Sequence, residues 1–171
     1  MNRLSIRVLA AGILALGVGA PLVAGAEDEA TVTYRQMTPE AAGKAATAAL
    51  ADCRRQGFQV AVAVVDRAGL LQFFIRDRFA GPHTVRVAQE KAWTSASFKI
   101  PTSELARATK PDSPESGIRH VPGVMVNGGG MPIQAAGSLV GAIGVSGAPG
   151  GPADEACAVA GIDAISDDLQ F

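Results

Sequence analysis

The chain has 171 residues, a length that favours a single domain, and its formal net charge at pH 7 is −1. Charged residues make up only 18%, which argues against a disordered acidic or basic protein, and the lack of a basic surplus argues against a nucleic-acid binder. Apolar residues reach 48% while aromatic residues account for only 5%, so we expect a core of small aliphatic side chains.

The N-terminus has the pattern of a secretory signal peptide. Two arginines precede an apolar run at residues 8–23, and an A-x-A cleavage pattern at 24–26 is followed by acidic residues. The run is shorter than the about 20 residues that span a bilayer. We therefore predict an exported protein, periplasmic or extracellular, without stable membrane insertion; an uncleaved anchor is the alternative. The expected division is a signal peptide at 1–26, a lead-in at 27–36 and a domain at 37–171.

The mature chain shows alternating helical and strand patterns. Thr38 as N-cap and Pro39 as first residue begin a helix, and Gly57 ends it. Short connections between strands indicate a mainly antiparallel sheet, and helices around it make an α+β domain with about five strands. The expected elements are a helix at 38–56, strands at 58–65 and 70–75, a helix at 83–98, a short helix from 101, a loop at 110–117, strands at 121–126, 131–133 and 139–145, and a helix at 154–168.

Two cysteines, Cys53 and Cys157, lie far apart in the sequence, each within an expected helix. An oxidising compartment permits a disulfide, so either one bridge or two small buried thiols is expected. Neither a C-x-x-C nor a C-x-x-C-H motif is present, which argues against a thioredoxin-type centre and against covalent c-type haem.

Glycine is concentrated between residues 128 and 151. Gly141 and Gly144 fall inside a strand pattern, where glycine often marks a close approach to the backbone. The approaching group is a helix, a ligand or a neighbouring subunit.

Catalytic motifs are weak. Residues 144–148 nearly match G-x-S-x-G, but the last glycine is alanine, and both His83 and His120 precede the serine although a hydrolase needs a later histidine. We therefore assign no catalytic residue.

Four polar residues are candidates for a site, and three of them are open to two interpretations. His83 is a haem or metal ligand or a first-turn polar residue, and Asp66 is a cation ligand or a turn residue. Lys91 is expected on a solvated helix face. Thr102 is favoured as a helix cap, with a contact to a bound group as the alternative.

Several segments, in this order and spacing, resemble the GlcG/HbpS family. The resemblance spans about residues 37–168. It is carried by AVAVVDRAGLLQFF at 61–74 with Arg76 and Asp77, Ala88, Lys91, Ala92 and Thr94, Gly129-Gly130-x-Pro132-Ile133, GSLVGAIGVSG at 137–147, and Asp154-Glu155. Residues 80–82, 101–106 and 147–149 are most similar to the secreted haem-binding HbpS branch.

The resemblance implies a compact α+β domain that assembles into a homo-oligomer, an octamer in the HbpS branch. It implies non-covalent haem binding and cooperation with a membrane sensor kinase in haem and redox sensing, with weak haem degradation as a further activity. Thr102 matches a threonine implicated in haem binding, and His83 is a departure that would change or strengthen the site. Lys91 and Arg76 complete the expected haem contacts, and His83 with Asp66 are the expected metal ligands.

Three hypotheses follow. The first is an exported haem-binding oligomer without strong catalysis. The second is an accessory protein or enzyme of small-acid, glycolate-type metabolism, in which Asp66, Arg76 and Lys91 hold a carboxylate. The third is a purely structural oligomer with the glycine-rich strand as its interface.

Overall fold

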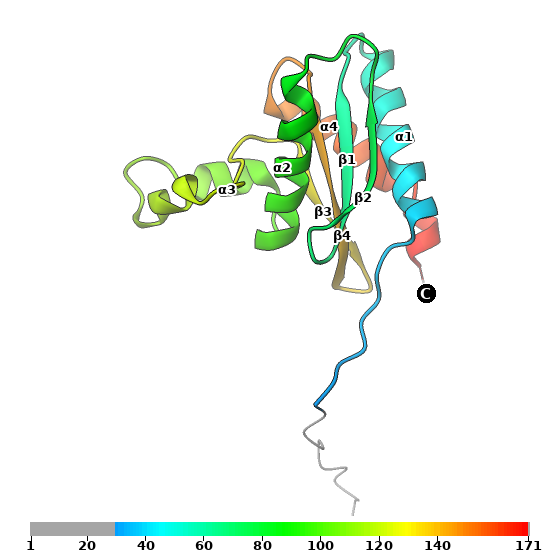
Figure 1. The fold of residues 1–171 in the computed structure, drawn as a ribbon, viewed down its shortest axis with the longest axis horizontal. Coiled ribbons are helices and arrows are strands. Elements are labelled where there is room, and N and C mark those ends of the chain that lie inside the picture. The colour runs from blue at the N-terminus through cyan, green and yellow to red at the C-terminus, as the bar shows by residue number, and fades with distance from the viewer. Residues whose placement is uncertain (1–29, 171) are drawn as a thin grey trace, which may run out of the picture. The chain divides into compact units, whose positions relative to one another are not determined.

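The structure is a computed structural model that describes residues 30–170 (Figure 1). The expected signal peptide at 1–26 lies outside the described residues. The contacts between residues separate the chain into two units, with the boundary after Thr33. The helices and strands belong to the second unit, Tyr34–Phe171. Within the described part, no helix is long and apolar enough to cross a bilayer.

The unit is an α+β domain built on a four-stranded antiparallel sheet with the order β2-β1-β4-β3. Helices α1 and α4 cover one face of the sheet and α2 covers the other (Figure 1). The strands are β1 (Ala61–Asp66), β2 (Leu71–Arg76), β3 (Gly130–Ala135) and β4 (Ser138–Ser146). The α-helices are α1 (Pro39–Arg55), α2 (His83–Phe98), α3 (Thr102–Ala108) and α4 (Gly151–Asp163), with 3-10 helices at Pro114–His120 and Asp167–Leu169.

Strand β1 shows how the sheet divides the core in two. Successive side chains of a strand point to opposite faces. Val62 and Val64 accordingly lie in the larger cluster with α1 and α4, while Ala61 and Ala63 face α2. Since both faces are covered, every residue of β1 is buried.

Small residues bring α2 unusually close to the sheet. A Cβ atom on Gly144 of β4 would overlap the carbonyl oxygen of Ala88 on α2. A Cβ on Gly141 would come within 2.6 Å of the Val65 carbonyl oxygen. In this structure, therefore, the groups that approach the strand glycines are the backbones of α2 and β1.

The helix signals in the sequence are confirmed for α1. Thr38 is the N-cap, and its Oγ1 accepts a hydrogen bond from the Ala41 N–H at 3.2 Å. Pro39 occupies the first turn, where its missing N–H costs nothing. Gly57 follows the helix end with φ +83°, which glycine adopts without steric cost.

The expectation of about five strands is wrong, because residues 121–126 form no strand. Their apolar pattern contains Pro122 and Gly123, and Gly123 has φ +85°. The segment turns instead, with Met125 N–H donating to Thr94 Oγ1 at 2.9 Å. The expected loop at 110–117 is partly helical, and the last α-helix ends at Asp163 rather than at residue 168.

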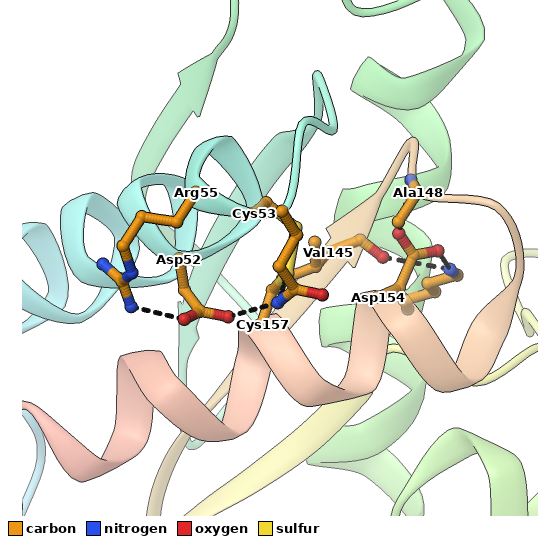
Figure 2. The surroundings of a disulfide bond; sticks show 9 residues. Asp52, Cys53, Arg55, Val145, Ala148, Asp154 and Cys157 are labelled. Atoms are coloured by element: carbon orange, nitrogen blue, oxygen red, sulfur yellow. Dashed lines mark hydrogen bonds and ion pairs between the residues drawn. A yellow bond between two sulfur atoms is a disulfide. The ribbon is translucent and has the colours of Figure 1, made fainter.

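A disulfide joins Cys53 of α1 to Cys157 of α4 (Figure 2). Both residues are fully buried, and their Cα atoms are 5.5 Å apart. The bond fixes the last turn of α1 to the middle of α4, on the side of the sheet opposite α2.

Candidate functional site

The connection Arg76–His83, between the edge strand β2 and helix α2, gathers exposed side chains of several chemical types. Phe79 is 80% exposed, and Arg78 and His83 are exposed as well. Ala80, between them, is buried and anchors the connection. An aromatic ring, a guanidinium and an imidazole are therefore presented to solvent by one short segment.

Hydrogen bonds hold this connection at its helix end. Arg76 Nη1 donates to the Ala80 carbonyl oxygen at 2.7 Å. The Gly81 carbonyl oxygen accepts from Thr84 Oγ1 at 2.7 Å and from the Thr84 N–H at 3.0 Å. Thr84 is buried, so these bonds tie the turn before His83 to the body of the domain.

An ion pair holds the strand end of the connection. The Asp77 carboxylate accepts from Arg54 Nε at 2.7 Å and Arg54 Nη2 at 2.9 Å, and from the Arg78 N–H at 2.8 Å. The hydrogen bonds from Arg54 hold the pKa of Asp77 below its ordinary value. The carboxylate is thus an anchored anion at neutral pH.

His83 is the first residue of α2, after Pro82 at the N-cap. Its ring lies over Gly81, where a Cβ atom would come within 2.7 Å of the imidazole Cε1. Across residues 30–170, no hydrogen bond or ion pair engages the imidazole. Its ring nitrogens are therefore available to a ligand from outside the chain.

The prediction that Lys91 lies on a solvated helix face is wrong, because its side chain is fully buried. It faces β4 and α4, and its Nζ donates to Asp154 Oδ2 at 2.7 Å and to the Val145 carbonyl oxygen at 2.9 Å. Asp154 Oδ1 accepts from the Ala148 N–H at 2.9 Å, so the pair is held from three elements (Figure 2). Burial lowers the pKa of Lys91 and raises that of Asp154, while their mutual hydrogen bond acts the other way.

Thr102 is not a helix cap. Pro101 is the N-cap of α3, and no side chain caps this helix. Thr102 Oγ1 instead donates to the Asn127 carbonyl oxygen at 2.7 Å and accepts from the Gly130 N–H at 2.9 Å. The residue is fully buried, so its hydroxyl joins α3 to the start of β3.

The structure places Asp66 far from His83. Asp66 Oδ1 accepts from the N–H groups of Ala68 and Leu70 at 2.8 and 2.9 Å, in the turn between β1 and β2. His83 follows the opposite end of β2, a strand of 6 residues that is about 17–20 Å long. Among the described residues, no three His, Cys, Asp or Glu side chains gather as a metal site.

The carboxylate pocket of the second hypothesis is not assembled either. Arg76 pairs with Ala61 at one end of β1, and Asp66 lies at the other end. Lys91 is engaged inside the domain by Asp154. The three residues proposed for that pocket therefore do not converge.

Sequence reasoning missed Phe79 and Arg54 as residues of this region. Phe79 lies in a segment that reads as a polar loop, and its exposure is the only signal that singles it out. Arg54 lies 23 residues before its partner Asp77, and no local pattern links the two.

The fold places this protein in a structural class, that of single α+β domains in which an antiparallel sheet lies between helices, as in HbpS. The chain belongs to the HbpS-like family, since the family model described as "haem degrading protein HbpS-like" matches residues 37–163.

Three solved structures are similar over most of the chain. A double mutant of Streptomyces reticuli HbpS is 39% identical, with a TM-score of 0.74, and covers 85% of this chain and 96% of its own. Protein ORFY of Klebsiella pneumoniae is 27% identical, with a TM-score of 0.77, covering 80% of this chain and 95% of its own. PduOC, solved as a haem complex, is 28% identical, with a TM-score of 0.72, covering 76% and 95%. No curated protein matches the chain.

Proposed function

We propose that this protein is an exported, non-covalent haem-binding protein in which His83 supplies the iron ligand. The observation that carries the proposal is the exposed imidazole of His83, which has no partner within residues 30–170, at the end of an anchored segment. Neutral imidazole is the commonest protein ligand of metals and a frequent ligand of haem iron.

Other residues of the Arg76–His83 connection could contact the porphyrin ring and the propionates of a haem group. The exposed ring of Phe79 supplies apolar surface for a porphyrin face. The exposed guanidinium of Arg78 suits a propionate, because arginine binds carboxylates through paired hydrogen bonds. Arg76 acts by holding the segment through the Ala80 carbonyl oxygen.

Two of the residues expected to contact haem lie inside the domain and fit that role less well. The Thr102 hydroxyl is buried, with one strong hydrogen bond donated and one accepted. The Lys91 ammonium is buried against Asp154. His83 is therefore the better iron ligand in this chain.

Family membership and the haem complex of PduOC support a haem-related role. Export is supported by the leader pattern and by the Cys53–Cys157 disulfide, a bond characteristic of oxidising compartments. Assembly into a homo-oligomer and a partnership with a membrane sensor kinase rest on the resemblance to HbpS, and we include them as parts of the proposal.

The test is an absorption titration of the mature protein with haemin. His120 is the matched control, since it is exposed and is the chain's other histidine. We expect a saturable Soret shift for wild type and for His120→Ala, and its loss in His83→Ala. No Soret shift in wild type, or an unchanged shift in His83→Ala, would overturn the proposal.

A further inference from the structure

The anchored carboxylate of Asp77 lies where β2 ends and the connection to His83 begins. Its side chain is only 1% exposed, whereas that of its partner Arg54 is 48% exposed. The Asp77 N–H also donates to the Val60 carbonyl oxygen at 2.9 Å, and its own carbonyl oxygen accepts from the Ala80 N–H at 3.2 Å. The main chain and the side chain of Asp77 therefore both hold the first residues of the Arg76–His83 connection in place.

Arg54 reaches Asp77 from the last turn of α1. The residue before it, Cys53, is disulfide-bonded to Cys157 of α4. The guanidinium is thus carried by a part of the helix that is covalently fixed to the domain core. Its two parallel hydrogen bonds to one carboxylate define an orientation as well as a distance.

We infer that the Arg54–Asp77 ion pair is the positioning device of the haem site, acting through the segment that carries Phe79 and His83. The inference rests on the proposed function, because a positioning role needs a ligand at His83. Of the remaining hydrogen bonds of the segment, those from Arg76 and Thr84 hold its helix end, and the main-chain bonds of Asp77 hold the residue itself beside Val60. Without the ion pair, the strand end of the segment keeps its main-chain hydrogen bonds but loses the side-chain anchor to α1.

Asp66 offers a matched control within the same hairpin. Asp66 is the last residue of β1, and Asp77 directly follows β2. Both side chains are buried, and both accept hydrogen bonds from main-chain N–H groups. Asp66 serves the turn at the far end of β2, remote from His83. A general loss of hairpin stability would follow from either substitution, whereas a loss of haem positioning would follow only from the change at Asp77.

The experiment compares haemin binding by Asp77→Asn, Arg54→Gln, the double variant and Asp66→Asn, with thermal unfolding of each apoprotein. Partners that orient a metal ligand typically contribute 10- to 100-fold to affinity, so we expect Asp77→Asn and Arg54→Gln each to weaken haemin binding on the order of 10-fold. Low-temperature electron paramagnetic resonance should show a broadened or mixed ferric signal. The double variant should be no weaker than Asp77→Asn, because both changes remove one interaction.

Asp66→Asn should keep the wild-type affinity and ferric signal. If Asp77→Asn does not fold, Arg54→Gln still tests the inference. The Arg54 side chain is half exposed, so we expect its replacement to be tolerated by the fold. Wild-type affinity and signal in Arg54→Gln, or equal weakening in Asp66→Asn, would overturn the inference while leaving the proposed function intact. Absence of binding in wild type would instead overturn the proposed function itself.

Discussion

Lys91 and Asp154 form an ion pair that is almost completely withdrawn from water, with an Nζ–Oδ2 distance of 2.7 Å and side chains that are 1% and 4% exposed. It joins α2 to α4 across the end of β4, so it connects the two helical layers on opposite faces of the sheet. The glycine at position 129 leaves room for it, because a Cβ there would come within 2.9 Å of Nζ.

Substitution of Lys91 alone should destabilise the domain strongly. Lys91→Met leaves the buried Asp154 carboxylate without its counter-charge, and breaking a buried pair in this way costs about 3–5 kcal/mol. Urea unfolding at neutral pH measures the difference. The double variant Lys91→Met with Asp154→Leu should recover much of the loss, since no charge then remains buried; a single variant as stable as wild type would contradict this view of the pair.

Thr102 should matter for stability rather than for iron ligation. Thr102→Val removes the hydroxyl that bonds Asn127 and Gly130, and unpaired buried groups cost about 1–3 kcal/mol. Thr102→Ser, which keeps the hydroxyl, is the control and should lie close to wild type. The Soret maximum of the haemin complex should be the same in all three proteins. A folded Thr102→Val protein that lacks the Soret band would show instead that the hydroxyl binds iron.

Loss of the disulfide should lower the stability of the domain. The bond joins residues 104 positions apart and so restricts the unfolded chain, an effect typically worth about 2–5 kcal/mol. The variant with Cys53→Ala and Cys157→Ala should therefore unfold at lower urea than wild type. Reductant should lower the wild-type midpoint and leave the double variant unchanged; equal midpoints of the two proteins without reductant would contradict the prediction.

The contribution of Asp77 to the free energy of unfolding should decrease on acidification. Hydrogen bonds from Arg54 lower the pKa of Asp77 from its ordinary value of 3.8, so the ionised form is favoured in the folded state. The stabilisation is complete above the ordinary value and is lost as pH falls through the lowered pKa. The free energies of unfolding of wild type and Asp77→Asn, measured with urea, should differ by a constant amount from pH 7 to about 5 and should converge as the pH falls below 3.8 and through the lowered pKa. A difference that grows on acidification would contradict this assignment.

Most helices and strands could be predicted because their signals are local. The N-cap at Thr38 and the stop at Gly57 define α1 within the span of one helix. The strand predicted at residues 121–126 was wrong, because the apolar run there contains Pro122 and Gly123, which turn the chain. The segment is held by a hydrogen bond from Met125 to Thr94 of α2, a partner 31 residues away.

The roles of the polar residues were harder to predict, because each depends on which neighbour the fold supplies. Thr102 stands at the start of a helix, where a capping residue is expected, yet its hydroxyl bonds to the main chain at the start of β3. Lys91 follows Glu90 in a helix and reads as a surface charge, but α2 turns it toward the sheet. His83 stood out because its position at a helix start is visible in the chain itself.

The sequence alone determined the α+β class, the family resemblance and the positions of the helices, since hydrophobic period, caps and glycine signals act over a few residues. Only the tertiary structure decided that Arg54 meets Asp77 and that Lys91 meets Asp154, pairs separated by 23 and 63 residues. Charged side chains carry no local pattern that names a distant partner. Whether a charge is solvated, buried or placed beside a ligand site is settled by the packing of the helices on the sheet.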